Sequence, residues 1–281
     1  HWQPLLRHGG DGADRGVSVE SFVRVDGVET GARPPLVLIH GVGLDHAMWD
    51  PVVEALATDR RVVRYDLLGH GRSPDPAGSR SMDDFVQQCL AVMDDHVDRI
   101  PDLAGLSLGG LIALGLAARH PGRLGRLALL NTVFDRTPDQ VRVAKARLAR
   151  TEAEGMALVA DLAIERWFAS DWQVAHPERV GAVRRCMLAN DVAAYLKAYR
   201  VFVDGDPTMP AAANVTARAL VMTGELDPGS TPAMSEALAS AVADGVARIL
   251  PGLRHLPPLE APEAFVAALL DFLDHRDQET P

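Results

Sequence analysis

The chain has few cysteines, few aromatic residues and no long apolar run. Its two cysteines, Cys89 and Cys186, lie far apart and lack the neighbours of a metal or redox motif, so we expect two buried free thiols. No uncharged apolar run reaches the roughly 18 residues that a membrane span requires, so we expect no membrane partner. Residues 1–16 are polar and glycine-rich, without a hydrophobic signal segment, which predicts a cytoplasmic location.

Basic residues are scarcer than acidic ones. The formal net charge is −10, and the lysines are limited to Lys145 and Lys197. Nucleic acids and acidic membrane surfaces attract basic patches, so this balance argues against both as partners. With 281 residues, of which 47% are hydrophobic, the chain is long enough to bury a large core.

Strand and helix patterns alternate along most of the chain. The expected strands cover residues 18–25, 36–39, 62–66, 102–104, 124–131, 219–224 and 246–250. A helix is expected over 81–96, with Ser81 as its cap and two acidic residues, Asp83 and Asp84, in its first turn. This alternation predicts an α/β fold in which a mostly parallel sheet carries helices on both faces.

Residues 105–109 read Gly-Leu-Ser-Leu-Gly, a G-x-S-x-G pentapeptide with a strand pattern before it and an apolar helical run after it. That context is typical of a nucleophile elbow, in which a sharp strand-to-helix turn holds a serine in a strained backbone conformation. Glycines two residues either side leave room for the turn. The pattern therefore indicates Ser107 as a nucleophile.

A serine hydroxyl needs a base to take its proton and an acid to orient that base. Asp227 lies in a turn directly after the strand expected at 219–224, and we take it as the acid. His255 lies in a loop after the strand expected at 246–250, and we take it as the base. The order Ser, Asp, His is that of α/β-hydrolases and not of chymotrypsin or subtilisin.

The tetrahedral intermediate of acyl transfer requires two N–H donors for its oxyanion. The amide of Leu108 directly follows the nucleophile, and the glycine-rich loop after the strand at 35–39 supplies Val42 as the second expected donor. His40, at the end of that strand, is interpreted as a residue that braces the loop by hydrogen bonds. His46 is left open between the pocket and solvent.

Several motifs together resemble the α/β-hydrolase superfamily over nearly the whole chain. They are His40-Gly41, residues 66–73, 105–110 and 224–227, and Arg254-His255. Within 66–73, His70 and Arg72 are read as loop-bracing residues. The amino-acid sequences of 105–110 and of 47–50 are most similar to the 3-oxoadipate enol-lactonase branch. The carbon–carbon hydrolases of aromatic meta-cleavage pathways are similar over the same motifs. The chain departs from those enol-lactonases at His40-Gly41, where they carry Asn-Ser. Some members of this fold place the acid where this chain has Asp135.

The alternation of strands and helices stops between about residues 134 and 213, where 137–168 and 177–203 have helical spacing. The resemblance implies a helical cap over the serine at this position. We therefore expect a core domain in two parts, 17–133 and 214–277, with the cap at 134–213.

The cap carries the residues expected to form the pocket. Trp167, Tyr195 and Tyr199 are taken as substrate-binding, from a wider set of cap aromatic residues that also includes Phe168, Trp172 and Phe202. Four cap arginines are candidates to pair with a substrate carboxylate: Arg166, Arg184, Arg185 and Arg200. The acidic residues Glu152, Glu154 and Asp161 are interpreted as a polar helix face.

These observations predict a serine hydrolase that cleaves a small carboxylic ester or lactone through an acyl-enzyme, with no metal or organic cofactor. The resemblance makes an enol-lactone such as 3-oxoadipate enol-lactone the first choice of substrate. A general carboxylesterase, a carbon–carbon bond hydrolase and an acyltransferase would use the same triad. A receptor without catalytic activity would retain only the fold.

Overall fold

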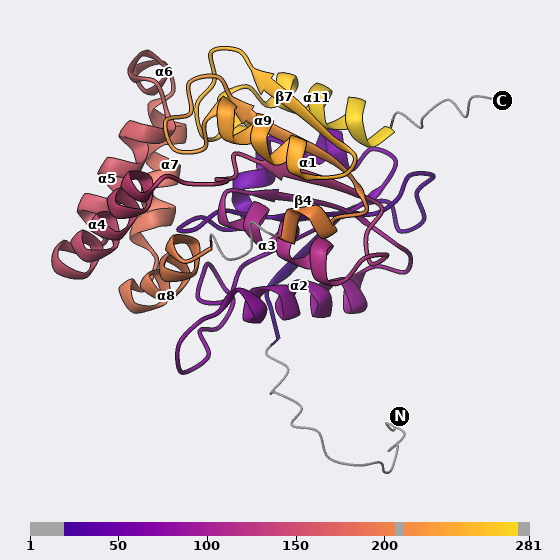
Figure 1. The fold of residues 1–281 in the computed structure, drawn as a ribbon, viewed down its shortest axis with the longest axis horizontal. Helices are drawn as coiled ribbons and strands as arrows, with labels where there is room; N and C mark the ends of the chain where they lie inside the picture. The colour runs from indigo at the N-terminus through magenta and orange to yellow at the C-terminus, as the bar shows by residue number, and fades with distance from the viewer. Residues whose placement is uncertain (1–19, 206–210, 275–281) are drawn as a thin grey trace, which may run out of the picture.

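The computed structural model describes residues 20–205 and 211–274, and within them seven strands form one sheet (Figure 1). The strands are β1 (Val23–Gly27), β2 (Leu36–Ile39), β3 (Arg61–Tyr65), β4 (Asp102–Leu106), β5 (Arg126–Leu130), β6 (Arg218–Gly224) and β7 (Gly245–Leu250). Their order across the sheet is β1-β3-β2-β4-β5-β6-β7. β1 pairs with β3 antiparallel and every other pair is parallel, which confirms the predicted mostly parallel sheet.

The first strand differs from its expected range of 18–25. β1 begins at Val23 because its register is set by β3, with Val23 opposite Tyr65 and Gly27 opposite Arg61. Before this ladder, the amide of Phe22 donates to Ser73 Oγ at 2.9 Å and so leaves the strand pattern. Residues 18 and 19, and the expected domain limits at 17 and 277, lie outside the described residues.

Helices cover both faces of the sheet. They are α1 (Asp50–Leu56), α2 (Met82–His96), α3 (Leu108–Arg119), α4 (Pro138–Glu154), α5 (Met156–Trp167), α6 (Ser170–Ala175), α7 (Pro177–Leu188), α8 (Val192–Val203), α9 (Pro232–Ala241), α10 (Pro257–Glu260) and α11 (Pro262–Asp274), with a short 3-10 turn η1 (His46–Trp49) before α1. α1 packs against α11 and α2 packs against α3, and Figure 1 shows these two pairs on opposite sides of the sheet. Ser81 caps α2, as the sequence predicts, and does so through a reciprocal capping box with Asp84.

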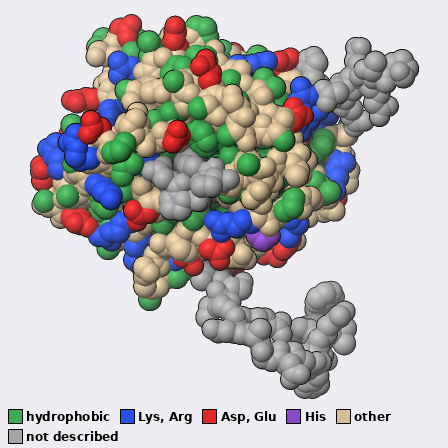
Figure 2. All heavy atoms as spheres, in the orientation of Figure 1, with side chains coloured by type: hydrophobic (Ala, Val, Ile, Leu, Met, Phe, Trp, Pro, Cys, Tyr) green, Lys and Arg blue, Asp and Glu red, His purple; other side chains and the backbone are tan. Residues whose placement is uncertain are grey.

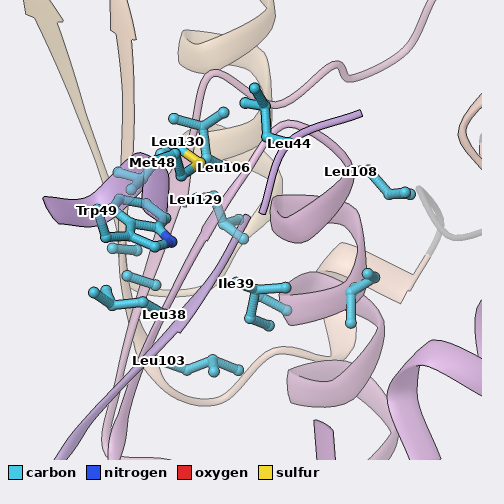
Figure 3. Packing of buried hydrophobic residues seen from close by; sticks show 14 of the residues in the cluster. Leu38, Ile39, Leu44, Met48, Trp49, Leu103, Leu106, Leu108, Leu129 and Leu130 are labelled. Atoms are coloured by element: carbon cyan, nitrogen blue, oxygen red, sulfur yellow. The ribbon is translucent and has the colours of Figure 1, made fainter. Parts of the chain in front are cut away.

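The core lies where the central strands meet α3. Parallel strands covered on both faces have no polar side, and accordingly every residue of β2 and β4 is buried. Figure 3 shows leucines of β2, β4 and β5 beside Trp49 and Met48 of η1. This packing fixes the carboxyl ends of β4 and β5, which carry part of the candidate site.

Helices α4 to α8 form an insertion between β5 and β6, and Figure 1 shows them together at one side of the sheet. They pack on one another through α4 with α8, α4 with α5, and α5 with α7. The helical run expected at 137–168 is interrupted at Gly155, whose φ of +76° ends α4. We propose that this insertion is the cap and retain the division into 17–133, 134–213 and 214–277, of which 206–210 lie outside the described residues.

Charged side chains of both signs are interspersed over the face of the molecule seen in Figure 2. Among the described residues, none of the helices combines the length and apolar character that a membrane crossing would demand.

Candidate active site

Ser107 lies in the sharp turn between β4 and α3. Its backbone has φ 57° and ψ −114°, a region that residues other than glycine adopt at a cost of about 1–3 kcal/mol. Its amide donates to the carbonyl of Leu130 in β5 at 2.8 Å, and the buried core strands hold both ends of this bond. The turn therefore projects the Ser107 side chain from the carboxyl edge of the sheet.

The glycines of the elbow are required by space. A Cβ on Gly105 would lie 2.1 Å from the carbonyl oxygen of Gly109, and a Cβ on Gly109 would lie 2.3 Å from the carbonyl oxygen of Ile39. Both distances are far below van der Waals contact. The G-x-S-x-G spacing thus follows from the close passage of the strand, the turn and the neighbouring strand β2.

Asp227 and His255 lie next to each other, on the loops after β6 and β7. His255 Nδ1 is 2.7 Å from Asp227 Oδ2, and the backbone amides of Gly229 and Ser230 donate to Asp227 Oδ1 at 2.9 and 3.0 Å. Burial alone would raise the pKa of Asp227, but His255 and the hydrogen bonds from Asn131 and Ser230 outweigh it and hold that pKa below its usual value. The carboxylate therefore stays ionised beside the imidazole.

Asn131, which the sequence analysis missed, completes the surroundings of this carboxylate. It follows β5 directly, adopts φ 47°, and donates from Nδ2 to Asp227 Oδ2 at 2.8 Å. The same amide group lies 3.1 Å from Thr223 Oγ1. Its only signal in the sequence is an amide residue at the carboxyl end of a buried strand.

Glu260 was also missed, and it holds the loop that carries His255. Its carboxylate accepts hydrogen bonds from the amides of Arg254 at 3.0 Å and Leu256 at 3.1 Å, the two residues that flank His255. Burial raises the pKa of Glu260 to about 7, against the opposing effect of these hydrogen bonds. Trp167 stacks on the imidazole of His255, with ring centroids 5.8 Å apart. The imidazole is therefore held by Trp167 on its face and by Asp227 at Nδ1.

One cavity of about 330 Å³ joins the elbow, the Asp227–His255 pair and the helical insertion. Its core side includes Val42, Ser107, Asp227 and His255. Its cap side includes all three aromatic residues predicted to bind substrate, Trp167, Tyr195 and Tyr199, together with Arg136, Ala144, Arg147, Arg166 and Phe202. The volume lies at the small end of the roughly 300–1,000 Å³ range of ligand pockets, which suits a small molecule.

The two expected oxyanion donors border Ser107. Val42 lines the cavity, and a Cβ on the adjacent Gly41 would lie 3.3 Å from Ser107 Cβ, so this loop passes directly beside the elbow. Leu108 is the first residue of α3. Among protein groups of the described chain, the N–H groups of Val42 and Leu108 have no acceptor.

His40 braces the loop after β2, as expected. Its Nε2 accepts the N–H of Leu67 at 2.9 Å, which leaves the proton on Nδ1 to donate to the carbonyl of Gly41 at 2.8 Å. Burial lowers the pKa of His40, and the ring is therefore neutral in this role. It connects the loop after β2 to the loop after β3.

Three polar residues in and near the 66–73 turn lie outside the cavity lining: His46, His70 and Arg72. His46, left open by the sequence, is bound through Nδ1 to Asp66 Oδ1 at 2.7 Å. His70 is buried, and burial lowers its pKa to about 3. Arg72 lies over the ring of Phe22, 4.0 Å from its centroid, and its amide donates to Asp66 Oδ2. These contacts stabilise the turn.

Of the four cap arginines proposed as carboxylate partners, Arg166 lines the cavity. Arg184 forms an ion pair with Asp161 at 2.7 Å and Arg200 pairs with Glu152, both at the surface, while Arg185 is exposed. The lining also includes Arg136 and Arg147, which the sequence analysis did not select. Asp135, the alternative acid, is exposed and does not line the cavity.

The expectation for the cysteines was half wrong. Cys89 is buried in α2, with its Sγ 3.9 Å from Met93 Sδ, but Cys186 is only half-buried. α7, which carries Cys186, lies in the insertion and buries only Val183 and Met187 on its inner side. A thiol next to that buried stripe remains partly exposed.

Residues 36–268 match the family described as the alpha/beta hydrolase family. The (E)-2-((N-methylformamido)methylene)succinate hydrolase of Acinetobacter baylyi is 33% identical over 249 residues, which cover 88% of this chain and 92% of that protein. The 3-oxoadipate enol-lactonase 2 of the same organism is 27% identical over 235 residues, covering 83% and 86%. The solved structure of the enol-lactonase from Burkholderia xenovorans matches with a TM-score of 0.84 and 33% identity, covering 92% of this chain and 98% of that one.

The chain therefore belongs to the alpha/beta hydrolase family. It is an enzyme of this class, and its relatives and structural neighbours are named hydrolases, esterases and lactonases. This agrees with the resemblance drawn from the motifs.

Proposed function

We propose that the protein is a serine hydrolase that cleaves a carboxylic ester or lactone through an acyl-enzyme, with Ser107 as nucleophile, His255 as base and Asp227 as acid. The observation that carries this proposal is the 2.7 Å contact of His255 Nδ1 with Asp227, on the wall of the cavity that Ser107 also lines. A buried carboxylate on Nδ1 keeps the proton there and leaves Nε2 free to accept another. The pair is thus suited to activate a hydroxyl group.

The reaction proceeds in two halves. Ser107 Oγ attacks the carbonyl carbon while its proton passes to His255 Nε2, and the carbonyl oxygen becomes an oxyanion held by the N–H groups of Val42 and Leu108. The intermediate collapses as the bond to the leaving oxygen breaks, and His255 returns the proton to that oxygen. Water then attacks the acyl-enzyme by the same route, which releases the acid and regenerates Ser107.

For the substrate we propose an enol-lactone such as 3-oxoadipate enol-lactone, held by Trp167, Tyr195 and Tyr199. The similarity to two named enol-lactonases supports this choice, and Arg166 at the cavity provides a cation for a substrate carboxylate. The 33% identity to a substituted succinate hydrolase favours a second candidate, hydrolysis of a carboxylated open-chain substrate. Such small, soluble substrates fit the proposed cytoplasmic location.

Replacement of Ser107 by alanine tests the function. The variant should lose at least about 10³-fold in turnover and keep a wild-type circular-dichroism spectrum, because only the hydroxyl group of the covalent step is removed. Burst release of p-nitrophenol from a short-chain ester, followed by steady turnover, separates a hydrolase from an acyltransferase or a receptor. A panel of simple esters, five- and six-membered lactones and a dienoate ring-fission product then ranks the substrates. A purified Ser107→Ala protein that keeps a tenth of wild-type activity would exclude the elbow assignment.

A further inference from the structure

The cap side of the active-site cavity borders a second, smaller hollow of about 20 Å³. Four side chains line both spaces and so form the wall between them: Arg147, Arg166, Tyr195 and Tyr199. The two tyrosines lie on α8, and their rings stack at 5.7 Å between centroids. Two guanidinium groups, from α4 and α5, therefore accompany two phenol groups at the end of the cavity formed by the cap.

These two arginines differ from the other arginines of the same helices in having no acidic partner. On α4, Arg142 pairs with Asp139 at 2.9 Å and Arg150 pairs with Glu154 at 3.1 Å. In the part of the chain that the structure describes, no carboxylate lies within 4.0 Å of Arg147 or Arg166, and Arg166 makes one hydrogen bond, to the carbonyl of Leu162 at 3.2 Å.

The electrostatics of the wall favour an anion. Burial and the nearby charge of Arg147 lower the pKa of Arg166, and they outweigh the opposing effects of the two tyrosines and of Asp227. The two cations therefore repel each other in a partly desolvated place. Guanidinium groups match carboxylates in planar, bidentate hydrogen bonds, which makes arginine the residue suited to bind them at such sites. The two acidic residues that line the cavity are engaged elsewhere, Asp227 with His255 and Asp139 with Arg142, so two carboxylates of a ligand would be needed to pair with both guanidinium groups.

We propose that Arg147 and Arg166 form a two-point anion site at the cap end of the cavity, which selects substrates whose non-reacting part carries two carboxylates. The reacting carbonyl lies at Ser107, and the carboxylates lie at the wall that separates the two hollows. The substrate class is thus an acyl derivative that keeps two free carboxylates besides its reacting carbonyl, which favours the carboxylated open-chain candidate over 3-oxoadipate enol-lactone, whose non-reacting part carries one carboxylate. This inference rests on the proposed function for the reaction, but the anion site itself can be tested without turnover.

Calorimetric titration of the full-length Ser107→Ala protein measures the site directly. The probes are glutarate, with two carboxylates, and valerate, with the same number of carbons and one carboxylate. We expect glutarate to bind at least 10-fold more tightly than valerate. Arg147→Met and Arg166→Met should each reduce glutarate affinity to that of valerate, and Arg147→Lys should restore part of it. The matched controls are Arg184→Met and Arg200→Met, whose arginines pair outside the cavity and which should bind glutarate as the parent does.

Equal affinity for the two probes would overturn the dianion site, and so would unchanged glutarate binding in Arg147→Met. If Arg166→Met does not fold, Arg147→Met still decides, because Arg147 is only half-buried and α4 buries few of its residues. The anion site and the proposed function can fail separately. If wild-type protein binds glutarate but hydrolyses no ester or lactone, the anion site is supported and the hydrolase function is overturned. If wild-type protein hydrolyses p-nitrophenyl butyrate and glutarate does not inhibit it, the hydrolase function is supported and the anion site is overturned.

Discussion

Replacement of Asp227 by asparagine is the substitution whose consequence the structure specifies most fully. Each oxygen of the carboxylate has defined donors: Oδ1 faces the amides of Gly229 and Ser230, and Oδ2 faces Asn131 Nδ2 and His255 Nδ1. An asparagine keeps its carbonyl oxygen on the two backbone amides and places its NH₂ group where Oδ2 was. That group donates to His255 Nδ1, so the imidazole proton moves to Nε2, which can then no longer accept the proton of the nucleophile.

The magnitude follows from these two losses. The wrong tautomer and the missing counter-charge should lower kcat by about 10³- to 10⁴-fold, equivalent to about 4–5.5 kcal/mol. The NH₂ group also faces the donor Nδ2 of Asn131, and this unsatisfied pair should destabilise the fold by about 1–3 kcal/mol. The loss of activity should therefore greatly exceed any loss of folded protein at 25 °C.

The assay is steady-state hydrolysis of a p-nitrophenyl ester across a pH series, with chemical denaturation of the same samples. Asp135→Asn is the matched control, because Asp135 is exposed and outside the cavity, and it should leave kcat within about twofold. The reasoning is refuted if Asp227→Asn keeps a tenth of wild-type activity with a normal fold. Greater damage from Asp135→Asn would move the acid to that position.

Two further predictions concern the scaffold of the site. The pKa of Glu260, about 7 in the folded protein against 4.5 ordinarily, means that its contribution to stability is full below pH 4.5 and is lost as pH rises to about 7. In urea titrations, the free energy of unfolding of the wild type should therefore fall relative to that of Glu260→Gln across that pH window. If the two proteins show the same pH dependence of unfolding free energy, the raised pKa of Glu260 is contradicted. Gly109→Ala should cost at least about 3 kcal/mol, because its Cβ would lie 2.3 Å from Ile39 O, whereas Gly115→Ala on the same helix meets nothing closer than 3.5 Å and should be neutral or stabilising by up to about 1 kcal/mol. Equal thermal midpoints for the two variants would show that the elbow tolerates a side chain.

The parts of the site that the sequence predicted are those that depend on local chain geometry. The elbow around Ser107 needs glycines at fixed spacing because strand, turn and helix meet within a few residues. Asp227 and His255 follow strands whose apolar patterns are plain, and parallel strands bring their carboxyl ends to one edge of the sheet. Their contact at 2.7 Å agrees with what that topology predicts.

The residues that the sequence did not predict act across long separations. Asn131 and Asp227 are 96 positions apart, and their hydrogen bond depends on β5 and β6 being neighbours in the sheet. Glu260 acts through backbone amides, which carry no residue-specific signal for its role. The predicted limits of β1 were wrong for a related reason. The extent of β1 is set by the partner strand β3 and not by its own hydrophobic pattern.

The cap arginines show most clearly what depends on tertiary packing and not on the local sequence. Arg147 and Arg150 are one helical turn apart on α4, yet Arg150 pairs with Glu154 while Arg147 turns into the cavity. Helical periodicity alone permits either residue to face inward, because the whole helix is polar and few of its residues are buried. The direction is decided by α5 and α8, which place Arg166 and the aromatic residues on the same side. On the proposed assignment, substrate selectivity depends on packing between the helices of the insertion, whereas the proposed catalytic groups depend on the sheet. The two can change independently through substitutions in different parts of the chain.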